Sequence, residues 1–396
     1  MERKVIQVEE RPPLLLNIPL SIQHLFAMFG ATVLVPFLFN VNPTTCLFMN
    51  GIGTLLYLFL TKGKIPSYLG SSFAFISPVM VILSTSSYSD AQSGFIVFGL
   101  IFILFSLIIK YTGTGWIDII FPPACMGAII AVIGLELAPT AAGMAGLTGD
   151  VIDFRNIAVS MFTLAVTIIG SVAFKGFMAI IPILFGVICG YIFSFFMGLV
   201  DLAPVAAAPW FQMPHFYQPT FNLNAILIIA PAALVVLAEH IGHLVVTGNV
   251  VERNLIKDPG LARSLFADGC SNVLSGFFGA TPNTTYGENI GVMAITKVYS
   301  VWVIGGAAVM AICLSFVGKL SELIRSIPVP VMGGVCILLF GVIAASGIRV
   351  LVESKVDYSK SANLVMSSVI MIVGLSGANS GYGACHTGCD FNELDF

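Results

Sequence analysis

The sequence predicts an all-α polytopic membrane protein made of two inverted seven-helix repeats. Three observations predict it: the apolar composition, interrupted spans that recur in the same order, and a one-sided distribution of basic residues. Of the 396 residues, 57% are hydrophobic and 9% are charged, whereas a soluble domain carries about 25% charged residues. Lipid must therefore cover most of the outside. The net charge of -3 gives no indication of nucleic acid as a partner.

Apolar stretches divide the chain into candidate spans, since a spanning helix needs about 20 mostly apolar residues. The thirteen candidates centre on residues 17–39, 44–61, 71–86, 93–110, 121–140, 157–174, 177–200, 223–248, 261–279, 287–296, 299–317, 329–346 and 361–378. Two copies of seven would need fourteen spans, and the composition turns polar after Gly377. We therefore expect the last helix to be missing from this sequence, and residues 379–396 to form an aberrant polar tail.

Two of the candidate spans are poor as continuous helices. Residues 65–78 contain Pro66, Gly70 and Pro78, and residues 281–291 are too polar to face lipid. Irregular backbone at membrane depth survives only where it is buried in protein or lines a cavity. Both segments are therefore expected to lie in the interior as broken spans.

The interrupted spans and their surroundings recur in the same order about seven spans later. The matching pairs are Gln23-His24 with Glu239-His240, Pro66 and Gly70 with Pro282 and Gly287, and Pro123 to Gly127 with Pro330 to Gly333. Because seven is odd, the second copy must be inverted in the membrane. Inverted repeats with paired broken segments are typical of secondary transporters whose site lies near the bilayer midplane.

The basic residues predict the orientation. If the N-terminus is cytoplasmic and every span crosses once, most lysines and arginines fall in cytoplasmic segments. The outside then holds Arg155, Lys319 and Arg325. This distribution obeys the positive-inside rule. We expect a multi-pass protein of the plasma (inner) membrane with a cytoplasmic N-terminus.

Two carboxylates lie at membrane depth. Glu239 is in the eighth span and Glu288 is in the tenth, and such groups usually face a cavity or a partner because burying their charge is costly. Two carboxyls near one site could hold a proton, which is what proton coupling requires. His243 follows Glu239 by four residues and shares its helical face, whereas His240 points about 100° away. A purely structural packing role remains open for both histidines.

Metal binding is not expected. The order Glu239-His240 with His243 reverses the zinc-protease pattern, in which two histidines four residues apart flank the glutamate. Cys385, His386 and Cys389 in the polar tail have no second ligand cluster nearby in the sequence.

The segment from Glu288-Asn289 through Gly291 to Thr296-Lys297 resembles the signature of the nucleobase–ascorbate transporter (nucleobase:cation symporter) family. The segments 18–36, 68–78 and 281–291 resemble the uracil-transporting bacterial members in particular. The likeness extends from about residue 10 to about residue 378. It ends at the tail.

The resemblance implies a core domain and a gate domain, with two short strands at the substrate site. The core would comprise residues 1–118 and 223–318, and the gate residues 119–222 and 319–378. The family's uracil contacts would fall on Phe73, Glu239, Tyr286, Gly287 and Glu288, supported by Ser72 and Asn289. Glu239, Glu288 and His243 would couple transport to protons.

The implied function is proton-coupled symport of uracil into the cell by alternating access, with no enzymatic activity and no cofactor besides the coupling proton. Membrane lipid is a further partner, and the resemblance allows a homodimer. Three alternatives stay open: a xanthine or uric acid permease of the same family, a passive channel, and an intramembrane enzyme. Competition by xanthine, uphill accumulation, and recovery of unmodified uracil would distinguish them.

Overall fold

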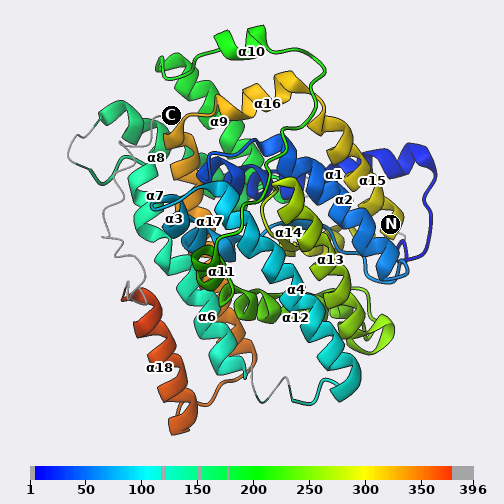
Figure 1. Ribbon diagram of the computed structural model, residues 1–396. Helices are drawn as coiled ribbons and strands as arrows, with labels where there is room; N and C mark the ends of the chain where they lie inside the picture. Colours follow the sequence, from blue (N-terminus) through cyan, green and yellow to red (C-terminus); the bar gives the residue numbers. More distant parts are fainter. Residues whose placement is uncertain (1–4, 117–118, 120–121, 150–152, 176–177, 377–396) are drawn as a thin grey trace. The chain divides into compact units, whose positions relative to one another are not determined.

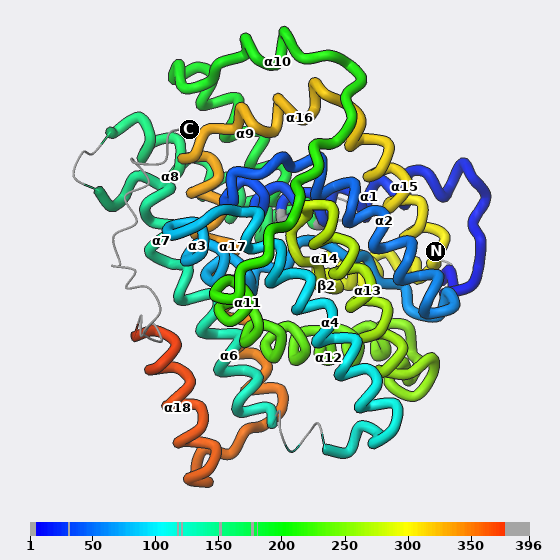
Figure 2. The backbone as a smooth tube through the Cα atoms, in the orientation of Figure 1, coloured from blue at the N-terminus to red at the C-terminus, as the bar shows by residue number. Residues whose placement is uncertain are grey.

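The computed structural model describes residues 5–116, 119, 122–149, 153–175 and 178–376. These residues are mostly helical and include one two-stranded sheet (Figures 1 and 2). The predicted polar tail, with Cys385, His386 and Cys389, lies outside the described residues. The chain divides into two compact units, Met1–Thr114 with Lys175–Ile181 and Leu202–Ser326, and Gly115–Phe174 with Pro182–Asp201 and Ile327–Phe396.

Seven helical segments in the described residues are long and apolar enough to cross a membrane. They are Leu14–Leu38, Pro43–Leu60, Tyr88–Thr112, Pro123–Met144, Phe154–Ala173, Leu223–Val250 and Val329–Glu353. Shorter apolar helices cover Phe73–Leu83, Pro182–Phe196, Val301–Ser315 and Ser361–Leu375. This number of apolar helices identifies a multi-pass membrane protein, as the composition predicted.

The first unit contains both strands and most of the helices. Its elements are α1 (Leu14–Leu38), α2 (Pro43–Leu60), β1 (Leu69–Ser71), η1 (Phe73–Phe75), α3 (Ile76–Leu83), α4 (Tyr88–Thr112), η2 (Met178–Ile180), α10 (Ala203–Ala207), α11 (Leu223–Ile229), α12 (Ala232–Val250), η3 (Ile256–Gly260), α13 (Leu261–Phe278), β2 (Asn283–Thr285), α14 (Gly287–Thr296), α15 (Val301–Ser315) and α16 (Gly318–Arg325).

The helices of this unit approach one another closely where small residues face each other. A Cβ atom on Gly99 of α4 would lie 2.7 Å from the carbonyl oxygen of Gly269 on α13, and the reverse holds for Gly269. Small residues let helix backbones come together in membranes, where packing replaces the hydrophobic effect as a driving force. A buried cluster from α1, α2 and α15 fills the space beside the strands, and Phe73 packs against it.

The two interrupted segments are confirmed as broken spans. In the first, strand β1 is followed by the short helices η1 and α3; in the second, β2 is followed by the short helix α14 (Figure 2). Both strands are buried along their whole length. The polar residues of 281–291 are therefore kept from lipid by protein, as their sequence required.

The N-terminal strap, defined as residues 5–11, runs alongside the linker between α14 and α15. Ile6 forms a parallel β-bridge with Val298, and the amides of Tyr299 and Val301 donate to the carbonyl oxygens of Ile6 and Val8 at 2.9 Å. Val8 is fully buried. The strap thus holds the end of the short helix that begins at the sheet.

A salt bridge and a ring contact hold the strap further along. Arg253, just beyond α12, pairs with both carboxylate oxygens of Glu9, with Nη2 at 2.8 Å from Oε2. The guanidinium of Arg11 lies 4.7 Å from the ring centre of Trp302. The strap therefore joins the end of α12 to the start of α15.

The second unit is a helical cluster of α6 (Pro123–Glu136), α7 (Ala138–Met144), α8 (Phe154–Ala173), α9 (Pro182–Phe196), α17 (Val329–Glu353) and α18 (Ser361–Leu375). Gly134 of α6 and Gly347 of α17 lie so close to the backbone of the other helix that a Cβ atom would clash. Residues 202–222 and 319–326, assigned to the gate on sequence grounds, cluster with the first unit. The roles of core and gate stay predictions.

Candidate substrate site

The centre of the candidate site is the antiparallel pair of β1 and β2. Leu69 faces Thr285, Gly70 faces Thr284, and Ser71 faces Asn283. Backbone hydrogen bonds of 2.9 Å extend the pairing at both ends, from Ser72 N to the carbonyl of Pro282 and from Tyr286 N to the carbonyl of Tyr68. Because each strand comes from a different repeat, the site is assembled from both halves of the chain.

The outer edge of each strand is satisfied by a polar side chain on the preceding helix. Thr54 of α2 accepts from the amide of Leu69 at 2.9 Å and lies 3.4 Å from its carbonyl oxygen. Asn272 of α13 accepts from the amide of Asn283 at 2.7 Å and donates to its carbonyl oxygen at 2.9 Å. Buried backbone groups need such partners, so two short strands suffice at membrane depth.

Tyr286 crosses the sheet and fixes its geometry. Its hydroxyl donates to the carbonyl oxygen of Ser71 at 3.0 Å, and its ring occupies the space where a side chain on Gly70 would lie. Glycine is therefore required at position 70 by close approach. This explains why the glycine that interrupts the third span stands there.

Gly287 and Glu288 open α14 directly after Tyr286. The side chain of its N-cap residue, Tyr286, makes no capping hydrogen bond. The first amide groups of a helix have no intrahelical acceptor and carry partial positive charge, so they are suited to a polar or anionic group. Glu288 is partly buried in this first turn.

Glu239 and His243 come from α12, and both are partly buried. Helix α12, which carries Glu239, packs against α14, which carries Glu288. His243 contacts β2, with Nδ1 at 3.1 Å from the hydroxyl of Thr285. A Cβ atom on Gly287 would lie 3.2 Å from Nε2 of His243. The structure thus brings Glu239, His243, Gly287 and Glu288 together, while pairing of His243 with Glu239 stays a prediction.

The supporting residues Ser72 and Asn289 are buried beside the strands. Asn289 donates to Nδ1 and the carbonyl oxygen of His24 on α1, both at 3.1 Å. Within the described part of the chain, Ser72 Oγ and Asn289 Oδ1 have no hydrogen-bond partner. Buried polar atoms are seldom left unsatisfied, so these two are suited to a bound polar molecule.

Sequence reasoning missed Asp268. It lies on α13, is fully buried, and has Oδ2 at 2.9 Å from Nδ1 of His240, which is also fully buried. The cost of a charge at membrane depth, which singled out Glu239 and Glu288, applies equally to Asp268 in the ninth predicted span. His240 therefore has an acidic partner, in addition to its packing contacts.

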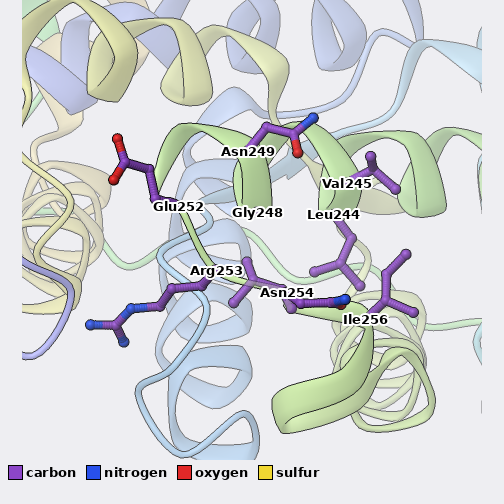
Figure 3. A pocket seen from close by; sticks show the side chains of 9 residues that line it. Leu244, Val245, Gly248, Asn249, Glu252, Arg253, Asn254 and Ile256 are labelled. Atoms are coloured by element: carbon purple, nitrogen blue, oxygen red, sulfur yellow. The ribbon is translucent and has the colours of Figure 1, made fainter.

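A separate cavity of about 440 Å³ lies at the end of α12. In Figure 3, the charged side chains of Glu252 and Arg253 extend away from the apolar side chains of Leu244 and Ile256. None of the predicted site residues lines this cavity. Arg253 is already engaged by Glu9 of the strap.

Comparison with known proteins identifies the family. Residues 16–380 match a permease family. The chain belongs to this family. The match confirms the resemblance to the nucleobase–ascorbate transporters and the prediction that the chain is not an enzyme, since its relatives are named as permeases.

Two of the similar proteins are uracil permeases of bacteria. A uracil permease of Escherichia coli strain K12 is 65% identical over 387 residues, which cover 97% of this chain and 90% of that protein. A uracil permease of Paenibacillus larvae is 62% identical over 384 residues, covering 96% and 91%.

The permease fold also occurs in distant solved structures. The transmembrane domain of a cyanobacterium bicarbonate transporter, BicA, matches with a TM-score of 0.70 at 15% identity, covering 94% of this chain and 99% of that one. At this identity the likeness concerns the fold alone. It confirms the predicted inverted-repeat architecture, together with the two short strands.

Proposed function

We propose that this permease carries uracil into the cell by proton-coupled symport with alternating access. The observation that carries the proposal is the 65% identity, over nearly the whole chain, to a protein named uracil permease. The grouping of Glu239, Glu288 and His243 beside the paired strands supports it. The same reasoning supports a plasma (inner) membrane location with the N-terminus in the cytoplasm.

The chemistry of uracil suits these residues. Its rim alternates N–H donors with carbonyl acceptors. A protonated carboxyl group can donate to a carbonyl oxygen and accept from the neighbouring N–H, and Glu239 and Glu288 offer two such groups. The amides at the start of α14 can donate to the second carbonyl oxygen, and Phe73 and Tyr286 can pack against the ring.

Two carboxyls close together also explain how a proton could be carried. Two negative charges in a poorly hydrated site repel each other, so protonation of one lowers the cost of holding both. A proton taken up with uracil and released with it would couple the two movements.

Uptake of labelled uracil into proteoliposomes under an imposed pH gradient, inside alkaline, tests the function. We expect accumulation of unmodified uracil above the external concentration, and weak competition by xanthine. Equilibration without accumulation would indicate a channel. Strong competition by xanthine, with poor uptake of uracil, would assign the site to purines instead.

A further inference from the structure

We propose that Asp268 and His240 are positioning residues that lock the helix of Glu239 to the strand leading into Glu288. This inference rests on the proposed function, because the residues that Asp268 and His240 position are those of the proposed uracil site. It starts from the contact between His240 Nδ1 and Asp268 Oδ2 at 2.9 Å, in which both side chains are 0% exposed. The two atoms are in ion-pair contact but do not form a hydrogen bond with each other.

On one side, Asp268 fixes the amide that supports β2. Its Oδ1 accepts from Nδ2 of Asn272 at 3.0 Å. The same nitrogen also lies 3.0 Å from the backbone carbonyl oxygen of Asp268, so the carboxylate and the backbone of Asp268 together hold the nitrogen end of the Asn272 amide. The same orientation lets Asn272 donate to the carbonyl and accept from the amide of Asn283. Asp268 thereby contributes to how β2 is held, three residues before Tyr286.

On the other side, His240 anchors α12. Its Nε2 lies 2.7 Å from the hydroxyl of Ser264 on α13, and that hydroxyl lies 2.6 Å from the hydroxyl of Tyr57 on α2. The rings of Tyr57 and Phe102 meet the imidazole edge-on. Glu239 is the neighbouring residue in the chain. A continuous set of contacts therefore runs from the helix of one site carboxyl to the strand of the other.

The placement of protons on the His240 imidazole determines the direction of its hydrogen bond to Ser264. With neutral His240 protonated on Nδ1, Nε2 accepts from Ser264, which in turn accepts from Tyr57. One more proton makes Nε2 a donor, so its bond to Ser264 must reverse, whereas the Ser264 hydroxyl can still accept from Tyr57. That proton also removes the net charge from a pair with no access to water, where a charge is costly.

The titratable groups that face the pair come from two elements. They are Tyr57 from α2, and Glu239 and His243 from α12. Glu239 interacts electrostatically with Asp268, and His243 interacts electrostatically with His240. From α4, the ring of Phe102 packs against His240.

Uracil binding to the purified full-length chain, measured from about pH 5.5 to about pH 8 alongside thermal stability, tests the proposal. Asp268→Asn leaves the shape but removes the charge. We expect it to raise the Kd for uracil at least tenfold, as loss of a buried charged hydrogen bond does. His240→Asn keeps a donor toward Asp268 but cannot titrate. We expect it to reduce the pH dependence of the Kd to the part that comes from Glu239 and Glu288.

Thr167→Val is the matched control, because Thr167 is fully buried in the second unit and donates within its own helix at 2.7 Å. It should bind uracil as the unaltered chain does. If Asp268→Asn does not fold, the pH dependence of the Kd of His240→Asn for uracil tests the proposal instead. Unchanged Kd values and an unchanged profile, or a loss of binding that merely follows the loss of thermal stability, would overturn the proposal. Failure of the unaltered chain to bind uracil would instead overturn the proposed function.

Discussion

At the scale of single residues, Glu239 and Glu288 are distinguished by their surroundings. Both are partly buried beside the paired strands, whereas Glu252, two residues after α12, is exposed. A carboxyl group that contacts uracil must donate in one place and accept in another. In an amide of the same shape, the oxygen can only accept a hydrogen bond and the nitrogen can only donate one.

We therefore expect each of the substitutions Glu239→Gln and Glu288→Gln to weaken uracil binding by about ten- to a hundredfold. This is the effect of losing a buried charged hydrogen bond, which is worth about 1.5–3 kcal/mol. Isothermal titration of the purified proteins measures this. Glu252→Gln makes the same chemical change away from the site and should bind normally. Normal binding by both site variants would remove these carboxyls from the substrate contacts.

The candidate site could be predicted only in part at this scale. Glu239 and Glu288 could be identified because a carboxylate is conspicuous in an apolar span. Asp268 could not be paired with His240 from sequence, since the contact depends on how α12 and α13 pack. Thr54 and Asn272 gave no signal, because polar residues of this size are common in membrane helices.

At the scale of elements, the strand edges depend on side chains from helices. Thr54→Val removes the hydroxyl that serves Leu69 while keeping the shape. An unsatisfied buried backbone group costs about 1–3 kcal/mol, so we expect that loss of stability in thermal or denaturant unfolding. The Thr167 hydroxyl donates to a carbonyl within its own helix, so Thr167→Val should cost less. Equal losses would contradict the role given to Thr54.

The strap gives a prediction about how its stabilisation changes with pH. The hydrogen bond from Arg253 lowers the pKa of Glu9. The ion pair therefore stabilises the strap at pH above the ordinary value for glutamate, and this stabilisation is lost as pH falls through the lowered pKa. Both side chains are substantially exposed, so solvent screening limits the effect to about 0.5 kcal/mol.

Arg253→Gln is accordingly expected to speed hydrogen exchange at the amides of Tyr299 and Val301, which donate to the strap. The difference from the unaltered chain should shrink in acid, where the unaltered pair is also broken. Arg155→Gln, which removes a surface pair with Asp153 in the second unit, is the control. An effect of both substitutions on these amides would argue against a specific strap contact.

The elements themselves were largely predictable. Apolar length marked the spans, and the prolines and glycines of 65–78, with the polarity of 281–291, marked the interruptions. The pairing of β1 with β2 was implied by family resemblance alone, because three-residue strands carry too little pattern to be read from sequence. The strap was missed, since its contacts are mostly backbone hydrogen bonds.

At the scale of the whole molecule, proton coupling predicts how transport responds to pH. Uptake of uracil should rise as the external pH falls, because protonation of the carboxyl pair accompanies binding. A protonophore should abolish accumulation while leaving equilibration. The measurement is uptake at fixed membrane potential with and without the protonophore. Accumulation driven by a sodium gradient at fixed pH would contradict the prediction that the coupling ion is a proton.

The pairing of β1 with β2 also has a consequence for biosynthesis. About two hundred residues separate the partners in the chain, so at roughly 5–20 residues per second the ribosome needs tens of seconds to deliver the second strand after the first. During that time Thr54 can serve one edge of β1, but the other edge awaits its partner. The first half of the protein must therefore be sheltered from lipid, by the insertion machinery or by its own helices, until the second half arrives. A ribosome stalled before residue 283 should leave a chain that is inserted but readily degraded.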